Sequence, residues 1–452
     1  MTDGIQTLLS TAATWLGAKV IGQDVEFCGV SSDSRSIESG SLFIALRGPN
    51  HDGHQHVAAA AQAGAVAALV EHPVDCVIPQ IIVDDSRIAL GRLASAWRRE
   101  LGLPLVAVTG SNGKTTVKEM CAAILAQAGM TLATRGNLNN DIGAPLTLLR
   151  LTREHRYGVI EMGANHPEEI RYLTNLTRPQ VAILNNAGSA HLEGFGSLEG
   201  VARAKGEIFE GLEEHGVAII NADDRYASLW REMNAGRQVL TFGLEQSADI
   251  SSRWQGDVYG SRLEVVTPVC EFRLDIALPG RHNVMNALAA IAAATALNID
   301  SHQIIAGLES LQPVGGRLQA QRGVNGATVI DDSYNANPDS MGAGIRVLAE
   351  CHGQRYLALG DMGELGVNTV ELHRSVGSEA REAGIDQLYA TGELSRGAVE
   401  AFGENGHYFE QQQQLIEALI PQLTSDVTVL VKGSRSSHME RVVEALCAGG
   451  GR

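Results

Sequence analysis

The sequence is poor in basic residues. Of its 452 residues, 35 are Lys or Arg and 52 are Asp or Glu, so the formal net charge is −17 at pH 7. Proteins hold the phosphate backbone of nucleic acids with clustered Lys and Arg. The chain has no such cluster, and we therefore expect no nucleic-acid partner.

Paired cysteines are also lacking. The chain has six cysteines and no Cys-x-x-Cys motif. Isolated cysteines of this kind are typical of free thiols in a reducing compartment, where they are buried as small hydrophobic residues. They are Cys28, Cys76, Cys121, Cys270, Cys351 and Cys447.

Long apolar runs are missing as well. No run approaches the ~18 residues of a membrane-spanning helix. The first residues, MTDGIQTLLS, lack the basic start and apolar stretch of a secretory signal. We expect a cytoplasmic protein with no membrane span.

Aromatic residues are scarce, at 4%, whereas glycine is abundant, at 50 residues. This balance suits α/β units with many tight turns. The length is sufficient for about three domains.

Residues 105–116, LVAVTGSNGKTT, form the most specific motif. An apolar run, a glycine-containing turn and a helical segment from Lys114 onward predict a strand, a loop and a helix. Such a loop directs backbone N–H groups to one point, and the helix dipole favours an anion there. A triphosphate fits, with Lys114 on its β- and γ-phosphates and the Thr115 hydroxyl on Mg²⁺. The common phosphate-loop pattern has a glycine where this chain has Val108.

Residues 1–84 are expected to form a small α/β unit. A helix is predicted over 56–63, and strands over 65–70 and 80–83. The loop GVSSDSR at 29–35 carries several hydrogen-bonding groups, and Arg47 adds a second guanidinium. From the residues alone, these groups fit turns and caps better than a binding site.

Three histidines in this unit, His51, His54 and His56, have a spacing that could suggest a metal site. No cysteine or second cluster completes four ligands. We expect solvated loop histidines.

Residues 85–312 alternate strands and helices. Helices are predicted over 85–101, 114–127, 145–149 and 284–297, strands over 131–134, 157–162, 181–185 and 217–220, and a β-rich stretch over 239–278. This alternation implies a parallel sheet that binds ligands at the carboxyl ends of its strands.

Three polar residues accompany these elements. Glu161 ends a predicted strand, where a carboxylate can contact Mg²⁺. His191 follows the next strand, and the residue pattern leaves a core role and a ligand role equally open. Lys205 lies in a helix with apolar residues at helical spacing, which by itself favours a solvated lysine.

Residues 313–452 are expected to form a second doubly wound domain, without a glycine loop. Strands are predicted over 327–331, 355–360, 387–391 and 427–431, and helices after Pro338 and over 369–383 and 394–402. Pro313 is a plausible boundary with the central unit.

Nine segments together resemble the Mur ligase family over essentially the whole chain. In order, they are TGSNGKTT, RGNLNND, IEMGANH, AHLEGFG, ARAKGEIF, GRHNVMNALAA, GGRL, DDSYNANP and VKGSR. The resemblance implies a small amino-terminal α/β substrate-binding domain, a central parallel-sheet P-loop ATPase domain and a carboxy-terminal Rossmann-like doubly wound domain. We place them at 1–84, 85–312 and 313–452. The family shares the departure at Val108.

The resemblance also implies an activity. It indicates an ATP-dependent amide ligase of peptidoglycan precursor synthesis, and DDSYNANP indicates the member that joins D-alanyl-D-alanine to UDP-N-acetylmuramoyl-tripeptide. The tripeptide carboxylate would take the γ-phosphoryl group of ATP, and the dipeptide amine would displace phosphate from the resulting acyl phosphate. No side-chain nucleophile is needed, in agreement with the absence of a Ser-His-Asp or Cys-His arrangement. We expect a monomer in which the last domain closes over the central one.

The same resemblance assigns roles to individual residues. The catalytic set is Lys114, Glu161, His191 and Lys205. Two Mg²⁺ ions would be held by Thr115, Glu161, His191 and Lys205, the last as a carbamate. ATP contacts are implied for Gly110, Ser111, Asn112, Gly113, Lys114, Thr115, Thr116, Asn283, Arg317 and Asp331. Substrate contacts are implied for Ser31, Asp33, Ser34, Arg35, Arg47, Asn137, Asn139, Asn140, Tyr334, Asn335 and Asn337.

Two other functions stay open. A folylpolyglutamate synthase-like ligase would share the central and last domains, but the amino-terminal unit and DDSYNANP favour the first interpretation. A non-enzymatic nucleotide-dependent switch would not need Lys114, Glu161, His191 and Lys205 together.

Overall fold

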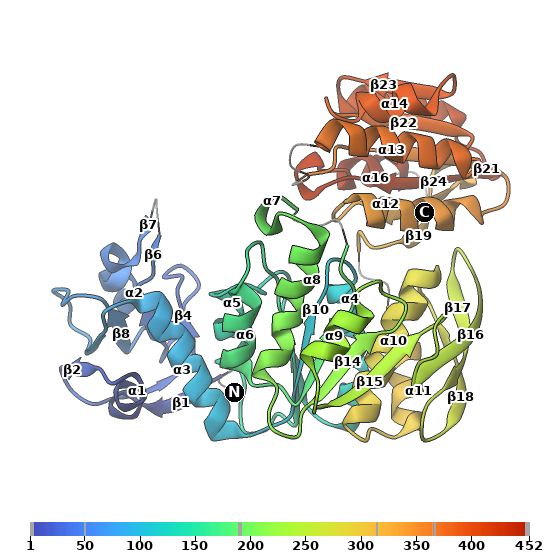
Figure 1. Cartoon of the computed structure of the whole chain (residues 1–452). Coiled ribbons are helices and arrows are strands. Elements are labelled where there is room, and N and C mark those ends of the chain that lie inside the picture. Colours follow the sequence, from blue (N-terminus) through green and yellow to red (C-terminus); the bar gives the residue numbers. More distant parts are fainter. Residues whose placement is uncertain are drawn as a thin grey trace.

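Three sheets of five, nine and six strands follow one another along the chain. The computed structural model describes residues 4–48, 51–188, 192–312, 315–363, 365 and 368–447. Figure 1 shows three bodies, coloured blue, then green to yellow, then orange to red. The prediction of an α/β chain with three consecutive units is confirmed.

The amino-terminal unit is a small α/β body. Its elements are β1 (Gln6–Leu8), α1 (Leu9–Leu16), β2 (Lys19–Ile21), β3 (Glu26–Cys28), β4 (Val30–Ser31), β5 (Leu42–Ile44), β6 (Arg47–Gly48), β7 (His51–Asp52), α2 (Val57–Gln62), β8 (Ala67–Val70) and β9 (Gln80–Ile82). The main sheet has the order β2-β9-β8-β5-β4, and only β2 is antiparallel to its neighbour. Helix α1 was not predicted, because its sequence LSTAATWL mixes small, polar and apolar residues.

His54 corrects the expectation of solvated histidines. It is buried, and its Nδ1 lies 2.7 Å from Oδ1 of Asp52. Its Nε2 accepts the backbone N–H of Glu71 at 2.8 Å. His54 therefore ties a loop to the end of β8 as a structural residue.

The cysteines differ from expectation as well. Only Cys121 is buried, and Cys270 is exposed. The other four are partly exposed, and all six are free thiols. The prediction that they are buried hydrophobic residues is therefore right for Cys121 alone.

Helix α3 (Ser86–Leu101) connects the amino-terminal unit to the central one. The Asp85 side chain caps its first turn by accepting the N–H groups of Arg87 and Ile88. Its apolar residues share one core with α1 and with α5 (Gly143–Leu148), as Leu9, Leu90 and Leu148 illustrate. The first two units are thus packed together without a break in apolar contact.

The central unit surrounds a nine-stranded sheet. Its elements are β10 (Leu105–Thr109), α4 (Lys114–Ala128), β11 (Thr131–Ala133), α5 (Gly143–Leu148), β12 (Tyr157–Glu161), α6 (Glu169–Thr177), β13 (Val181–Leu184), α7 (Leu192–Phe195), α8 (Leu198–Gly206), the 3₁₀ helix η2 (Glu207–Gly211), β14 (Val217–Asn221), α9 (Ala227–Met233), β15 (Gln238–Gly243), β16 (Ile250–Asp257), β17 (Gly260–Val266), β18 (Glu271–Ile276), α10 (Arg281–Ala296) and α11 (Ser301–Glu309). The order is β11-β12-β10-β13-β14-β15-β16-β17-β18. All neighbours up to β16 are parallel, as predicted, and β17 and β18 add an antiparallel edge.

Strand β10 lies inside this sheet and is buried on both faces. Leu105 and Ala107 contact the core shared with α3, whereas Val106 and Val108 contact the core beneath α4 and α10. A strand that is buried on both faces has a continuous apolar sequence. This burial holds the glycine loop at the carboxyl end of a rigid strand.

The carboxy-terminal unit has a six-stranded sheet. Its elements are β19 (Gln319–Arg322), β20 (Thr328–Asp332), α12 (Pro338–Ala349), β21 (Gln354–Leu359), α13 (Thr369–Glu382), β22 (Gln387–Thr391), α14 (Arg396–Phe402), β23 (Gly406–Phe409), α15 (Gln412–Leu419), β24 (Val427–Lys432) and α16 (Glu440–Cys447). The order is β19-β20-β24-β21-β22-β23, and only β19 is antiparallel to its neighbour. Within the described ranges, no helix of the chain is long and apolar enough to cross a bilayer.

Candidate active site

The glycine loop turns sharply between β10 and α4. Gly113 has a φ of 77°, in the left-handed region that favours glycine. A Cβ at this position would lie 2.4 Å from Oδ1 of Asn286 and 2.6 Å from Nδ2 of Asn185. Both the backbone conformation and the close approach therefore require glycine here.

Two asparagines that follow β13 hold the glycine loop by hydrogen bonds to its backbone. Asn186 accepts the N–H of Ser111 with its carbonyl oxygen at 3.0 Å and that of Asn112 with Oδ1 at 2.8 Å. Asn185 donates from Nδ2 to the carbonyl oxygen of Asn112 at 3.0 Å. These two residues were not predicted to belong to the site. The sequence does hold a signal for them, because a polar pair directly after an apolar strand is typical of a ligand-binding strand end.

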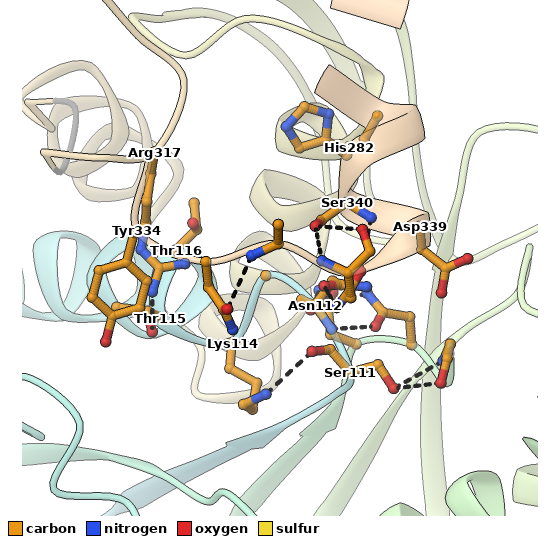
Figure 2. Close-up of a pocket in the computed structure, with 18 of the residues that line it drawn as sticks. Ser111, Asn112, Lys114, Thr115, Thr116, His282, Arg317, Tyr334, Asp339 and Ser340 are labelled. Atoms are coloured by element: carbon orange, nitrogen blue, oxygen red, sulfur yellow. Dashed lines mark hydrogen bonds between the residues drawn. The ribbon is translucent and has the colours of Figure 1, made fainter. Parts of the chain in front are cut away.

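Lys114 folds back over the loop. Its Nζ donates to the carbonyl oxygen of Gly110 at 2.7 Å. It also donates to the carbonyl oxygen of Ser111 at 3.3 Å (Figure 2). Burial lowers the pKa of Lys114, and the nearby Glu161 carboxylate opposes that shift. The loop thus holds the Lys114 amine against two of its own carbonyl oxygens.

Glu161 ends β12, which is paired with β10 so that Glu161 lies opposite Val108. Its Oε1 accepts Nδ2 of Asn139 at 2.8 Å. Its Oε2 is buried and has no hydrogen-bond partner among the residues that the structure describes. A buried carboxylate oxygen without a donor is the kind of ligand that a hard cation such as Mg²⁺ requires.

Lys205 corrects the expectation from helical spacing. Its side chain on α8 is buried, with only 1% of the residue exposed. Burial lowers the pKa of Lys205 well below its usual value, and the Lys114 ammonium acts in the same direction. The spacing argument fails because the polar position of this helix faces the interior of the central unit.

The polar loop after β11 approaches Glu161 from the side. Asn137, Asn139 and Asn140 all line the cleft described below. Asn140 also caps α5, with Oδ1 accepting the N–H of Gly143 at 2.8 Å. A Cβ on Gly163 would lie 2.9 Å from the Asn139 side chain, so the loop packs closely against the segment after β12.

The carboxy-terminal unit reaches the glycine loop through two side chains. Arg317 donates from Nη2 to Oγ1 of Thr115 at 3.2 Å, and its guanidinium lies 4.3 Å from the centre of the Tyr334 ring (Figure 2). Asn337 donates from Nδ2 to Oδ1 of Asn112 at 2.8 Å. Residues more than two hundred positions apart in the sequence thus meet at one loop.

Buried polar contacts shape the loop that presents Tyr334 and Asn337. Asp331 accepts the Ser333 hydroxyl at 2.6 Å and the N–H of Gly316 at 3.0 Å. Lys432 donates to Oδ2 of Asp332 at 2.5 Å and to the carbonyl oxygen of Asn335 at 3.0 Å. Burial raises the pKa of Asp332, and the Lys432 ammonium opposes that shift.

A cleft of about 1260 Å³ lies between the central and carboxy-terminal units. Most of the predicted site residues line this cleft. They are Ser111, Asn112, Gly113, Lys114, Thr115, Thr116, Asn137, Asn139, Asn140, Glu161, Asn283, Arg317, Tyr334, Asn335 and Asn337. Asp332 and Lys432 also line it and were not predicted. Gly110, Lys205 and Asp331 do not line it, and His191 lies outside the described residues.

The five substrate contacts that the resemblance implies for the amino-terminal unit lie elsewhere. Ser31, Asp33, Ser34, Arg35 and Arg47 belong to the amino-terminal unit and do not line the cleft. Arg35 pairs with Asp33 through bonds of 2.9 and 2.8 Å and holds the pKa of that carboxyl well below its usual range. The structure therefore does not gather them into one site with the glycine loop.

Family models cover most of the chain. The Mur ligase middle domain matches residues 108–294, the Mur ligase glutamate ligase domain matches residues 316–435, and the catalytic domain of the Mur ligase family matches residues 26–98.

Curated relatives match over nearly their full length. The chain is 45% identical to UDP-N-acetylmuramoyl-tripeptide–D-alanyl-D-alanine ligase of Escherichia coli (strain K12), over 98% of both chains. It is 36% identical to the protein of the same name from Bacillus subtilis (strain 168), over 92% of this chain and 93% of the relative.

Solved structures agree. A crystal structure of MurF from Acinetobacter baumannii has a TM-score of 0.93 and 36% identity, over 98% of this chain and 99% of that one. MurF ligase from Thermotoga maritima in complex with ADP has a TM-score of 0.84 and 27% identity, over 93% and 97%. This chain belongs to the Mur ligase family.

Proposed function

We propose that the chain is an ATP-dependent amide ligase that joins D-alanyl-D-alanine to UDP-N-acetylmuramoyl-tripeptide and releases ADP and phosphate. The product is the UDP-N-acetylmuramoyl-pentapeptide, a precursor of peptidoglycan. The observation that carries the proposal is the meeting of the glycine loop with Arg317 and Asn337 of the next unit, in a chain that aligns over 98% of its length with a ligase of this name. We further propose a cytoplasmic monomer with domains at 1–84, 85–312 and 313–452.

The glycine loop is the proposed triphosphate site. Loop N–H groups and the N-terminus of α4 favour an anion, and Lys114 can exchange its bonds to two loop carbonyls for bonds to phosphate oxygens. Arg317 bridges from the opposite wall to Thr115 and supplies a further cation for the γ-phosphate. Asn283 and Asp331 are proposed to contact adenine and ribose.

The donor set fits Mg²⁺. Glu161 offers an unpartnered buried oxygen, and Thr115 offers a hydroxyl beside the loop. The lowered pKa of Lys205 favours the neutral amine, which can add to CO₂, forming an N–C bond and losing a proton to give an anionic carbamate. We propose that Thr115, Glu161, His191 and carbamylated Lys205 hold two Mg²⁺ ions, which would neutralise part of the triphosphate charge.

The chemistry needs no side-chain nucleophile. A carboxylate and a triphosphate repel each other, so Lys114 and Arg317 must offset charge before the terminal carboxylate of the tripeptide can attack the γ-phosphorus. ADP leaves and an acyl phosphate remains. The amine of D-alanyl-D-alanine then attacks the acyl carbon, phosphate departs, and the amine loses a proton as the amide forms.

The remaining substrate contacts are assigned by position. Asn137, Asn139 and Asn140 are proposed to hold the muramoyl peptide next to Glu161. Tyr334, Asn335 and Asn337 border the nucleotide and the incoming dipeptide. Ser31, Asp33, Ser34, Arg35 and Arg47 are proposed for the uridine-diphosphate end, which would extend toward the amino-terminal unit.

Phosphate release from ATP tests this function. We expect release only when Mg²⁺, UDP-N-acetylmuramoyl-tripeptide and D-alanyl-D-alanine are all present, because the acyl phosphate forms on one substrate and is consumed by the other. Release that depends on a folate and glutamate instead would select a folylpolyglutamate synthase-like activity. No release with any acceptor would select a nucleotide-binding switch.

A further inference from the structure

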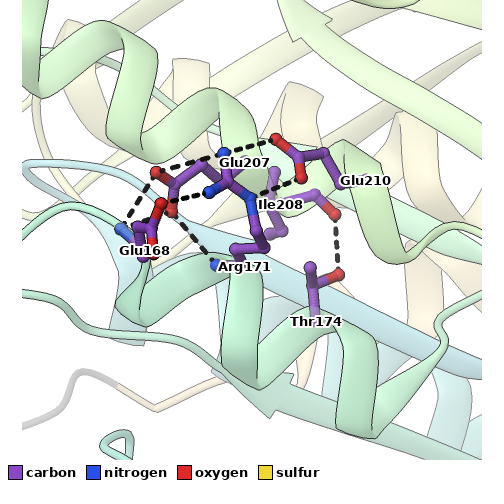
Figure 3. Close-up of polar contacts among 6 residues, drawn as sticks. All are labelled: Glu168, Arg171, Thr174, Glu207, Ile208 and Glu210. Atoms are coloured by element: carbon purple, nitrogen blue, oxygen red, sulfur yellow. Dashed lines mark hydrogen bonds and ion pairs between the residues drawn. The ribbon is translucent and has the colours of Figure 1, made fainter.

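Three side chains join α6 to the segment that follows Lys205. Thr174 of α6 donates from Oγ1 to the carbonyl oxygen of Ile208 at 2.7 Å. Arg171 pairs with both carboxylate oxygens of Glu210, at 2.6 and 3.1 Å. The third is Glu207, whose carboxylate lies beside Glu168 and Arg171 in Figure 3.

Glu207 is buried, with 6% of the residue exposed, and its carboxylate closes the N-terminus of α6. Each carboxylate oxygen accepts the backbone N–H of Glu168 at 3.0 Å, and Oε2 also accepts that of Arg171 at 3.1 Å (Figure 3). The first N–H groups of a helix have no partner within the helix, and a negative charge there is favourable. Glu207 thus satisfies backbone groups that would otherwise lack a protein partner.

These bonds also hold a strained residue. Glu168 has a φ of 71°, in the left-handed region, which is unfavourable for an L-residue other than glycine. Such a conformation persists only where the surroundings fix it. The two bonds from the Glu207 carboxylate to the Glu168 N–H supply that constraint.

The two ends of this link carry residues of the proposed metal site. Glu161 lies at the start of the loop that ends in Glu168, and this loop lines the cleft at Gly163, Ala164 and Asn165. Lys205 lies two residues before Glu207, at the end of α8. The carboxylate of Glu207 therefore connects the segment that carries Glu161 to the segment that carries Lys205.

We propose that Glu207 is a positioning residue that sets the separation of Glu161 and Lys205, and that divalent-cation binding depends on it. The inference rests on the proposed function, because the cation is the one assigned to those two residues. In this proposal Glu207 acts through its bonds to the backbone N–H groups of Glu168 and Arg171. Residues that orient metal ligands from outside typically contribute about 10- to 100-fold to metal affinity or activity.

Mn²⁺ binding in the presence of a non-hydrolysable ATP analogue tests the proposal, with free Mn²⁺ followed by electron paramagnetic resonance. We expect Glu207→Ala to bind Mn²⁺ at least about tenfold more weakly than the wild type. We expect Glu207→Gln to lie in between, because one amide oxygen can still accept both N–H groups. Glu210→Gln is the matched control. It changes a carboxylate of the same cluster that, among the residues described by the structure, accepts from the Arg171 side chain alone, and we expect wild-type affinity.

Amide hydrogen exchange over residues 163–171 separates positioning from simple capping. Faster exchange in Glu207→Ala together with weaker Mn²⁺ binding supports the proposal. Faster exchange with unchanged Mn²⁺ binding would show that Glu207 only caps α6, and would overturn it. If Glu207→Ala does not fold, Glu207→Gln decides by the same comparison. Failure of the wild type to bind Mn²⁺ with nucleotide would instead refute the proposed function.

Discussion

Lys114→Met is expected to lower kcat by about 10³-fold, the upper part of the range for removing one preorganised group that stabilises transition-state charge. Methionine keeps the aliphatic length and removes only the cation. The Lys114 amine lies over the loop, 2.7 Å from the carbonyl oxygen of Gly110, at the place where we expect phosphate oxygens. Without it, the incoming carboxylate meets a more negative γ-phosphoryl group.

Thermal unfolding and nucleotide binding complete this test. The loop shape depends on Asn185 and Asn186, which Lys114→Met leaves in place, so we expect a folded protein with a near-normal melting temperature. Steady-state kinetics with all three substrates then report the chemical step. A folded Lys114→Met protein with wild-type kcat would contradict the assignment of this loop to the reacting phosphate.

Lys205→Met is expected to reduce kcat at least about a hundredfold, because losing the metal ligand that we propose here should cost no less than losing a group that only orients one. We expect the Lys205→Met protein to fold. The Lys205 amine is buried, and burial lowers its pKa. An apolar side chain of similar length therefore removes the cost of burying a charged amine. We expect an unchanged or higher melting temperature.

The dependence of activity on carbon dioxide is the control for the proposed carbamate on Lys205. The wild type assayed in CO₂-depleted buffer should lose activity and regain it on addition of bicarbonate, because the carbamate re-forms on the amine. Lys205→Met has no amine and should not respond. Recovery of Lys205→Met activity by bicarbonate alone would show that a modified lysine is not needed.

Local sequence predicted those parts of the fold whose residues carry their own signal. Residues 105–108 are apolar without interruption because β10 is covered on both faces, and Gly113 marks a left-handed turn before α4. The polar ends of the parallel strands likewise indicated Glu161. These features follow from backbone conformation and burial within a few residues.

Features that depend on tertiary contacts were not predicted. Lys205 has the spacing of a solvated helix residue, and only packing of α8 against the central sheet reveals that it is buried. His54 is buried because Asp52 and the backbone of Glu71 satisfy both ring nitrogens. Lys432 reaches the site by pairing with Asp332, one hundred residues away, across neighbouring strands.

The resemblance to the Mur ligases predicted that Arg317 and Asn337 belong to the site, which residue spacing could not do. Both residues line the cleft. Their hydrogen bonds to Thr115 and Asn112 cross between two units. No periodicity in either unit encodes that contact. A family pattern that covers the whole chain includes residues from both units, and so it can predict both sides of the cleft.

Oxygen-isotope transfer tests the central claim most directly. UDP-N-acetylmuramoyl-tripeptide labelled with ¹⁸O in its terminal carboxylate is turned over with ATP and D-alanyl-D-alanine, and the released phosphate is analysed by mass spectrometry. Attack of that carboxylate on the γ-phosphorus predicts one ¹⁸O atom in each phosphate. Unlabelled phosphate, or AMP that carries the label, would contradict an acyl-phosphate route through the glycine loop and Lys114.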